Sequence, residues 1–391
     1  MMKSNFSTII EYGSTCFRLG VFGENFVKLH FSSNNIIEKD NYEEHSKIIN
    51  ILIKDAEKKI SNHLENIILL YDSPNIFSID LSIKRDFDQK TFINDIYASI
   101  ILEANQLIKN NYIKNKILHV VAVKNIIDGK EIIGNLKNNL EANSVIIEIK
   151  FICIPKEIYN KILNNFKKNN LQILNFFCSS YVKSFFYVNS FNKKNLINFL
   201  DIGFERSTLI TFENKKLMDI KSIPIGGNHI TKDISNVLEL SIEESEKIKK
   251  SFNKSENEFS YKKDINENNE LAKEILEKSI SVDLLKKVIL SRIEEIFDLI
   301  FEDPTFIKNL NNKNSILVLT GNGSKLFNKN SFHLNQKYSF EEISFYEENV
   351  AEICEAGLNF ELNSDANDIK IITKNPKKPG FFENFFNFFG R

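Results

Sequence analysis

The sequence predicts an α/β protein built from two related lobes. The chain has 391 residues, enough for two average domains or one split, two-lobed domain. A strand–turn–strand pattern at Glu11–Gly20 recurs at Asp201–Ile210, about halfway along. A later apolar strand, within Ser315–Phe327, runs into a glycine loop that opens a helix. Together these observations favour two similar halves, each containing a sheet.

Composition excludes several other classes of protein. A hydrophobic fraction of 42% and an aromatic fraction of 12% predict a sizeable core, not a disordered chain. Lys+Arg 51 against Asp+Glu 52 gives no basic excess for nucleic acid. The beginning, MMKSNFSTII, has no secretion signal, and no run of about 18 uncharged apolar residues predicts a membrane span. We expect the four scattered cysteines to be reduced core residues: Cys16, Cys153, Cys178 and Cys354.

The first half alternates strands and helices. Residues 6–31 predict three strands, followed by a helix at Asn41–Ile60 and a buried strand at Glu65–Asp72. The pattern at Pro74–Asp88 is mixed and polar. A small α+β unit then looks inserted; its elements are a helix at Thr91–Lys109, a strand at Ile117–Val123, a turn at Gly129, a strand at Ser144–Ile154 and a helix at Lys156–Asn169.

The second half predicts one sheet followed by helices. An apolar strand at Asn195–Gly203 leads into a hairpin-like meander at Ser207–Gly227. Helices follow at Asn228–Glu239, at Ser241–Ser251 with capping residues Ser241 and Glu244, and at Ser281–Phe301. Residues 252–270 predict an exposed loop, and the chain becomes polar again after Glu361.

Three glycine turns, each after an apolar strand, carry the candidate chemistry. They are Glu11-Tyr-Gly13-Ser14-Thr15, Asp201-Ile-Gly203 and Thr320-Gly321-Asn-Gly323-Ser324. Such turns bring backbone N–H groups and hydroxyls within reach of phosphates. One turn alone is more often a simple hairpin corner. Two acidic-glycine hairpins in separate halves, with a later glycine loop, favour a nucleotide held in a cleft between the lobes.

One segment resembles a known family. The run Ile223-Pro-Ile-Gly226-Gly227-Asn228-His229-Ile-Thr231-Lys-Asp233-Ile234, followed by Ser241-Ile-Glu-Glu-Ser-Glu246-Lys-Ile-Lys249, resembles FtsA, the membrane-bound, actin-related proteins of bacterial cell division. The resemblance extends to His119–Val121, Ser291–Ile296, the Gly321 loop and the C-terminal tail. It implies an actin-like two-lobed α/β fold with an inserted α+β subdomain and a C-terminal amphipathic helix.

The resemblance also implies a division of the chain. The expected ranges are 1–81 and 169–194 for the first lobe core, 82–168 for the inserted subdomain, 195–230 and 311–361 for the second lobe core, 231–310 for a second-lobe helical subdomain, 362–375 for a flexible linker and 376–391 for a membrane-targeting helix.

ATP and Mg²⁺ are the ligands that the resemblance implies. Glu11 and Asp201 are the candidate catalytic carboxylates, with Asp201 near the hydration shell of Mg²⁺. Glu246 and Lys249 match a helical pair at the ribose and adenine, although alone they would be a solvated surface pair. The remaining nucleotide-binding candidates lie in the glycine segments: Gly13, Ser14, Thr15, Gly203, Ser207, Gly226, Gly227, Gly321, Gly323 and Ser324.

The second phosphate turn departs from the family pattern. Phe204-Glu205-Arg206 stands where the family has Gly-Gly-Thr. A Glu repels phosphates and a Phe obstructs backbone approach, while Arg206 offsets part of the repulsion. We therefore expect weakened nucleotide binding and at most weak ATPase activity. A fully degenerate pocket is the competing interpretation.

The last residues predict an amphipathic membrane helix. Five phenylalanines recur on one face, with Phe388 beside them: Phe381, Phe382, Phe385, Phe386 and Phe389. Lys377, Lys378 and Arg391 flank them. Docking on the protein's own core is the alternative, but the polar stretch before the helix and the aromatic rings favour the membrane interface.

The family implies an adaptor at the division site, on the cytoplasmic face of the inner membrane. It would bind the C-terminal peptide of FtsZ on the lobe containing residues 231–310, self-associate into filaments and recruit later division proteins. Two rivals stay open. One is a PilM-like scaffold of type IV pili; the other is a sugar-kinase-like phosphotransferase, disfavoured by Phe204–Arg206.

Overall fold

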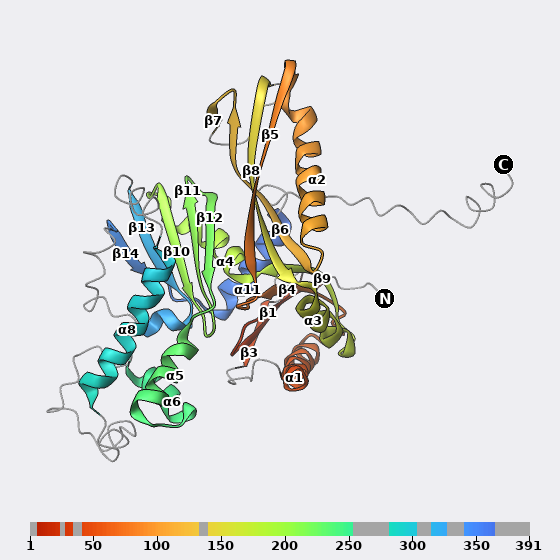
Figure 1. Ribbon diagram of the computed structural model, residues 1–391. Coiled ribbons are helices and arrows are strands. Elements are labelled where there is room, and N and C mark those ends of the chain that lie inside the picture. The colour runs from red at the N-terminus through yellow and green to blue at the C-terminus, as the bar shows by residue number, and fades with distance from the viewer. Residues whose placement is uncertain are drawn as a thin grey trace.

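Two five-stranded sheets form the centre of the molecule. The computed structural model describes residues 6–23, 28–33, 41–132, 140–252, 281–302, 314–326 and 340–363. The sheets stand side by side, with a third, longer sheet projecting beyond them (Figure 1).

The first sheet has the order β3-β2-β1-β4-β9. Its strands are β1 (Ser7–Tyr12), β2 (Phe17–Phe22), β3 (Lys28–Ser33), β4 (Asn66–Tyr71) and β9 (Gln172–Cys178). The first three form an antiparallel meander, and β4 and β9 run parallel to β1. Strands β1, β2 and β4 are nearly continuous buried runs because helices cover both faces.

Helices from distant parts of the sequence cover the two faces of this sheet. Tyr12 points toward His45 on α1 (Tyr42–Ile60), whereas Ile9 points toward Gly357 on α11 (Val350–Asn363). These two strand residues lie on opposite faces, because side chains alternate along a strand. Helix α3 (Lys156–Lys168) packs beside α1 and β9.

The second sheet repeats the arrangement of the first. Its order is β12-β11-β10-β13-β14, with strands β10 (Leu196–Ile202), β11 (Ser207–Glu213), β12 (Lys216–Ile223), β13 (Ser315–Thr320) and β14 (Glu342–Phe345). The pairings are again antiparallel, antiparallel, parallel and parallel. Strand β1 therefore corresponds to β10, and β9 to β14. The predicted pair of related lobes is confirmed.

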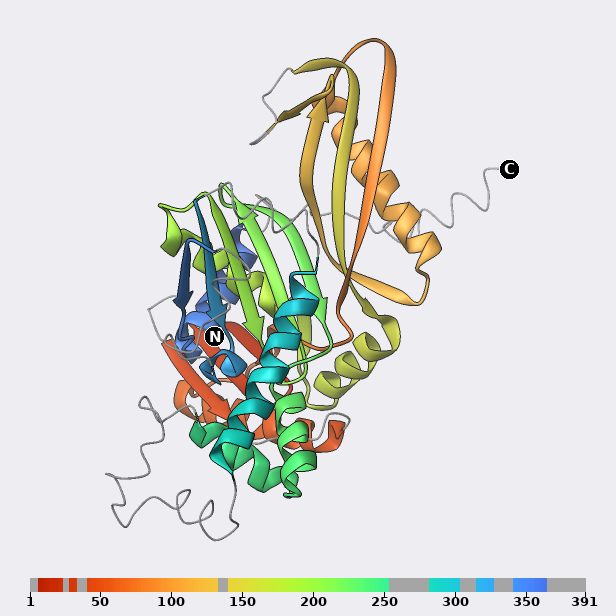
Figure 2. The ribbon, with the colours of Figure 1, turned by 60° about the vertical axis from the view of Figure 1, so that its left-hand side comes forward.

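Helices α5 (Gly227–Leu238), α6 (Ile242–Phe252) and α8 (Val282–Ile300) form one end of the second lobe (Figure 2). They share an apolar core with the second sheet, which includes Ile230, Ile248 and Leu285. The predicted capping box of α6 is present. The Ser241 hydroxyl accepts from the Glu244 N–H at 3.2 Å, and the Glu244 carboxylate accepts from the Ser241 N–H at 3.0 Å.

The third sheet belongs to the segment that looks inserted from sequence. Its order is β5-β8-β6-β7, formed by β5 (Phe77–Phe92), β8 (Glu141–Pro155), β6 (Asn115–Ile127) and β7 (Lys130–Ile132). Helix α2 (Ile93–Asn111) lies along one face (Figure 2). Strand β5 occupies the stretch that looks mixed and polar in sequence, because most of its side chains are at least partly exposed while β8 pairs with its backbone.

Two parts of the fold differ from the ranges expected from sequence. Strand β9 continues into α4 (Ser179–Tyr187) and a short 3-10 helix, η1 (Val188–Phe191), which sequence patterns did not predict. Helix α11 falls in the range 311–361 that we expected in the second lobe, yet it packs on β1, β2 and α4. A methyl group at Gly20 would meet Cys354 Cβ at 2.5 Å, which shows how closely this helix approaches the first sheet.

The four cysteines are buried and free, as expected. None of the helices in the described ranges has the length and apolar character needed to cross a bilayer. Three predicted segments lie outside the described residues. They are the part of the 252–270 loop from residue 253 on, the linker beyond Asn363 and the phenylalanine tail.

Candidate nucleotide site

Two matching turns follow the strands that carry Glu11 and Asp201. In the first, between β1 and β2, the Gly13 N–H donates to the Cys16 carbonyl at 3.1 Å. In the second, between β10 and β11, the Gly203 N–H donates to the Arg206 carbonyl at 2.8 Å. Gly13, Ser14 and Thr15 are half-buried, as are Gly203, Phe204 and Glu205. The sequence echo is therefore a structural repeat of one four-residue turn.

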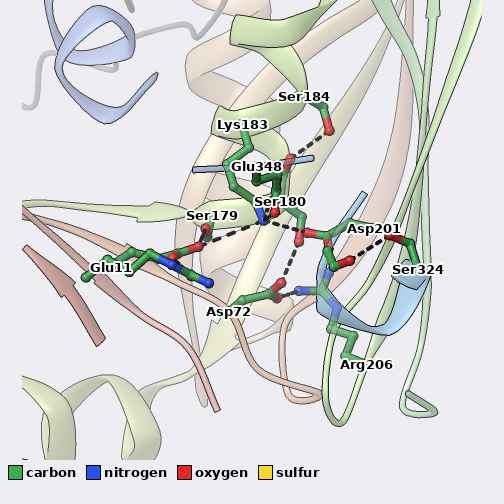
Figure 3. A network of polar contacts seen from close by, with 12 residues as sticks. Glu11, Asp72, Ser179, Ser180, Lys183, Ser184, Asp201, Arg206, Ser324 and Glu348 are labelled. Atoms are coloured by element: carbon green, nitrogen blue, oxygen red, sulfur yellow. Dashed lines mark hydrogen bonds and ion pairs between the residues drawn. The ribbon is translucent and has the colours of Figure 1, made fainter. Parts of the chain in front are cut away.

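A buried lysine links the acidic residues that precede these turns (Figure 3). Lys183, on α4, places its Nζ 3.0 Å from Asp201 Oδ2 and 3.9 Å from Glu11 Oε1. Glu348, just before α11, completes the group, with its Oε1 at 3.0 Å from the same Nζ. Each of the four side chains is at most 8% exposed. The charges of both lobes thus meet on one ammonium group.

Further contacts hold Glu11 in place. The Arg18 guanidinium pairs with its Oε2, and the Ser179 hydroxyl donates to its Oε1 at 2.7 Å. Burial alone would raise the pKa of Glu11, but the positive charges of Arg18 and Lys183 hold that pKa below its ordinary value. Glu11 is therefore ionised at neutral pH.

Glu348 behaves differently from Glu11. Burial, together with the nearby negative charges of Asp201 and Glu11, raises the pKa of Glu348 to about 7, and Lys183 opposes the shift only in part. The pKa of Lys183 is raised well above its usual range: burial opposes the charged form, but the three surrounding carboxylates outweigh it. The lysine stays charged, and Glu348 takes up a proton more readily than Glu11.

A second ionic contact joins the lobes through the unusual Phe204–Arg206 turn. Arg206, which is buried, pairs with Asp72 at the end of β4, and the Ser180 hydroxyl donates to Asp72 Oδ2 at 2.6 Å (Figure 3). The guanidinium that we expected to offset Glu205 near a phosphate is therefore held by a carboxylate of the other lobe. The Phe204 ring lies over Lys249, with Nζ 5.7 Å from the ring centroid.

Gly226 and Gly227 pack directly on this turn. A methyl group at Gly226 would meet the Gly203 carbonyl oxygen at 2.5 Å and the Arg206 nitrogen at 2.8 Å, so only glycine fits. The first N–H groups of α5 donate to the turn: Gly227 to the Gly203 carbonyl at 2.9 Å and Asn228 to the Phe204 carbonyl at 2.6 Å. These glycines therefore pack against the backbone of the second turn.

Glu246 and Lys249 form a buried pair. Each residue is 6% exposed, and Lys249 Nζ lies 2.6 Å from Glu246 Oε2. The ammonium also donates to the Gly227 carbonyl at 2.9 Å and to Thr231 Oγ1 at 2.7 Å. Burial lowers the pKa of Lys249, and Glu246 opposes this in part. The pair is not a solvated surface pair; it ties α6 to the start of α5.

The third glycine segment closes over the second carboxylate. Gly321 has φ +81°, and a Cβ there would collide with Asp201 Oδ1 and the Ile202 carbonyl oxygen. Gly323 packs on the Ile202 side chain, and the Ser324 hydroxyl donates back to the Gly321 carbonyl at 2.7 Å. Ser207 is fully buried, and its hydroxyl donates to the Ile225 carbonyl at 2.7 Å.

ATP and Mg²⁺, the ligands that the resemblance implies, place different demands on these residues. The glycine turns contain half-buried backbone, which suits phosphate groups. Mg²⁺ fits poorly: it needs several oxygen ligands in near-octahedral order, whereas Asp201 and Glu11 face an ammonium. The described residues also contain no group of three or more acidic, His or Cys side chains placed to hold a metal ion.

Sequence reasoning found the carboxylates and glycines but missed their partners. Lys183, Glu348, Asp72 and Arg18 were not among the candidates. One signal for Lys183 was available, since it is the single charged residue in the largely apolar run Ser179–Tyr187. Asp72 and Glu348 had no comparable signal, because each follows a strand in a polar stretch typical of loops.

Comparison with known proteins supports the resemblance to FtsA. Residues 199–331 match the family model described as cell division protein FtsA. This range includes Asp201, Gly226, the Glu246–Lys249 pair and Gly321. The resemblance to FtsA is confirmed. The FtsA protein of Bacillus subtilis (strain 168) is 30% identical over 151 residues, 38% of this chain and 34% of that protein.

The FtsA protein of Staphylococcus epidermidis is 22% identical over 170 residues, 44% of this chain and 36% of that protein. The matched part thus spans about a third of these curated relatives. Among solved structures, the PilM-PilN type IV pilus biogenesis complex contains a chain that superposes with a TM-score of 0.60, covering 92% of this chain and 97% of that one at 11% identity. The fold is actin-like.

Proposed function

We propose that this chain is an FtsA-like adaptor of bacterial cell division, which connects FtsZ polymers to the cytoplasmic face of the inner membrane and recruits later division proteins. The match of residues 199–331 to the FtsA family carries this proposal. This range includes Asp201, the turn that begins at Gly203, the Gly226–Gly227 pair and the Glu246–Lys249 pair. In this proposal the protein is a scaffold that self-associates, and its cleft regulates assembly.

The cleft would bind ATP weakly and hydrolyse it slowly or not at all. Two features support weak binding: Arg206 is engaged by Asp72, and Lys249 is engaged by Glu246, Thr231 and the Gly227 carbonyl. A nucleotide has to compete with these buried contacts. Steady-state phosphate release by the pure protein tests the proposal. Rapid turnover that is lost in Asp201→Ala would contradict it.

The phenylalanine tail would supply the membrane contact. Half burial of six Phe side chains contributes on the order of 5–9 kcal/mol. Ordering about ten residues costs roughly 10 kcal/mol, which hydrogen bonding within the helix recovers in part. One tail should therefore bind reversibly, and several tails on one filament should bind stably because of their effective concentration.

Liposome sedimentation tests the membrane contact. The full chain should pellet with anionic liposomes, and a chain ending before Pro376 should stay in the supernatant. Phe385→Ser combined with Phe386→Ser is a matched control that keeps the length and the flanking charges. Equal pelleting of all three would show that the tail is not the membrane contact.

An FtsZ tail peptide separates this proposal from its main rival. The superposition on a PilM chain favours, as a second candidate, a scaffold of another membrane machine with the same fold. An adaptor of cell division should retain the FtsZ C-terminal peptide in a pull-down, with binding reduced by substitutions on α5 or α8. A PilM-like scaffold should not retain it. A phosphotransfer screen with small sugars tests the remaining kinase alternative.

A further inference from the structure

We propose that the Lys183 ammonium is a built-in substitute for the divalent cation of this cleft, so that the lobes are joined without Mg²⁺ and nucleotide binding does not require it. The proposal deepens the proposed function only in its nucleotide part. The replacement of a cation by Lys183 concerns the protein without nucleotide and can be tested in its absence.

Position is the first support. Glu11 and Asp201 occupy equivalent places, each two residues before a four-residue turn on the corresponding strand of its lobe. Lys183 Nζ lies between them, 3.9 Å from Glu11 Oε1 and 3.0 Å from Asp201 Oδ2. A cation shared by the two carboxylates would have to occupy the place of this ammonium.

Neutralisation is the second support. A buried carboxylate is very costly without a counter-charge, and two or three together are more so. Lys183 faces Asp201, Glu348 and Glu11, and Arg18 adds a second positive charge on Glu11. The cluster therefore already carries the counter-charge that a metal ion would supply.

Attachment is the third support. Lys183 is on α4, which follows β9 of the first lobe and packs against α11 and β11. Its side chain is 7% exposed. Because the chain itself holds the ammonium in place, chelators cannot remove it. We therefore expect the contact between the lobes to be independent of divalent ions.

The chain offers a matched control for this lysine. Lys150 is also buried and also lies between two carboxylates, with Nζ 2.5 Å from Asp80 Oδ1 and 2.9 Å from Asp219 Oδ1. Its partners are largely exposed, however, at 72% and 46%. Loss of Lys150 leaves carboxylates that water can solvate, whereas loss of Lys183 leaves a closed acidic site.

Thermal unfolding of the full chain, with Mn²⁺ or with EDTA, tests the substitution. The wild-type midpoint should be the same in both within about 1 °C. Lys183→Ala should lower it in EDTA by roughly 5 °C or more and regain a substantial part of that with Mn²⁺. The unfolding midpoint of Lys150→Ala should not rise when Mn²⁺ replaces EDTA. The proposal is overturned if Mn²⁺ stabilises the wild type as much as Lys183→Ala, or leaves Lys183→Ala unchanged.

Direct ion binding keeps the test decisive if Lys183→Ala does not fold. Titration of the wild-type chain with Mn²⁺, followed by electron paramagnetic resonance, should show no bound ion that depends on the cleft. One bound Mn²⁺ in the wild type that disappears in Asp201→Asn would overturn the proposal.

A fluorescent ATP analogue tests the nucleotide part. The wild-type dissociation constant should differ by less than about threefold between Mg²⁺ and EDTA, whereas Lys183→Ala should bind at least about tenfold more weakly in EDTA than in Mg²⁺. A wild-type protein that needs Mg²⁺ would refute this part. If the wild type binds no analogue in either buffer, the proposed nucleotide binding fails, while the Mn²⁺ experiments still decide the role of Lys183.

Discussion

Three carboxyl groups from the two lobes share the Lys183 ammonium, and they do not share it equally. Glu11 has Arg18 as a second counter-charge, whereas Glu348 faces Asp201 and Glu11 with only Lys183 to offset them. Like charges at close range oppose full ionisation. Burial is the main cause that raises the pKa of Glu348 to about 7, and these two like charges add to it, whereas Arg18 and Lys183 hold the pKa of Glu11 below its ordinary value.

Glu348 should make the protein less stable as pH rises. Its pKa is higher in the folded state than in the unfolded chain, so between about pH 4.5 and 7 the folded state holds a proton that the unfolded state has lost. Stability should fall across this window, by up to about 3 kcal/mol, and level off above it. Glu348→Gln should lack this loss and be the more stable protein at pH 8.

Urea unfolding of both proteins at pH 5 and at pH 8 measures the difference. The comparison between wild type and variant removes the contribution of all other titrating groups that the two share. An identical change between the two pH values in both proteins would show that Glu348 does not take up the proton.

The Arg206–Asp72 pair should contribute measurably to stability. Arg206→Met removes a buried charge and leaves Asp72, 23% exposed, with the Ser180 hydroxyl as a remaining donor. We expect a loss of about 2 kcal/mol in urea unfolding, less than for a fully buried partner because water reaches the carboxylate. Arg85→Met, which breaks an ion pair with Glu103 that is about 40% exposed on both sides, should cost less than about 1 kcal/mol. Equal costs would show that the Arg206–Asp72 pair contributes no more to stability than an exposed ion pair does.

Among the helices, α6 begins with a capping box and carries Lys249 to the start of α5. Ser241→Ala removes the hydroxyl that accepts from the Glu244 N–H and should cost about 1 kcal/mol of stability. Ser99→Ala is the control, because its exposed hydroxyl only donates to a carbonyl within α2 and its loss should be within about 0.5 kcal/mol of neutral. Thermal unfolding measures both. A larger effect of the control would contradict the importance of the cap.

Elements with a strong apolar periodicity could be predicted from sequence. Elements whose structure depends on contacts with distant parts of the chain could not. Helix α1 and strand β10 follow their sequence patterns because each buries a continuous apolar side. Strand β5 escaped prediction because polar residues fill most of it, and its pairing with β8 depends on residues far away in sequence. The lobe on which α11 packs is likewise a property of packing, set by the small residues Gly20 and Gly357.

The same distinction applies to the candidate site. Glu11, Asp201 and the glycines are local signals, since each glycine permits a turn or a close approach that its neighbours require. The partners of these residues are set by tertiary structure. Lys183 and Glu348 are 165 residues apart, and no local pattern relates them.

At the scale of the whole molecule, the inserted segment also contacts the second lobe. Lys150 on β8 pairs with Asp219 on the edge strand β12, and the Ser78 hydroxyl donates to the Ile220 carbonyl at 3.1 Å. The insert thus contacts an edge that would otherwise be free to pair with another chain. These contacts attach the insert to the second lobe.

Reversal of the charge at this contact should loosen the insert. Asp219→Lys places a like charge beside the buried Lys150 ammonium, so backbone amides of β12 and the facing part of β6 should exchange hydrogen faster. Amides of β1 and β4, remote from the contact, provide the internal control. Unchanged exchange in β12 would show that the insert is held by other contacts.

The pairwise equivalence of the central residues has a consequence for how such a cleft can arise. Glu11 and Asp201 precede matching turns, and Lys183 and Glu348 lie in the segments that follow the matching strands β9 and β14. A chain of half this length, closing a cleft with an identical copy, would set each side chain opposite its own duplicate, acid against acid. Fusion of the halves lifts that restriction. One copy of the segment then carries Lys183 and the other carries Glu348, so the two halves contribute opposite charges to the joint.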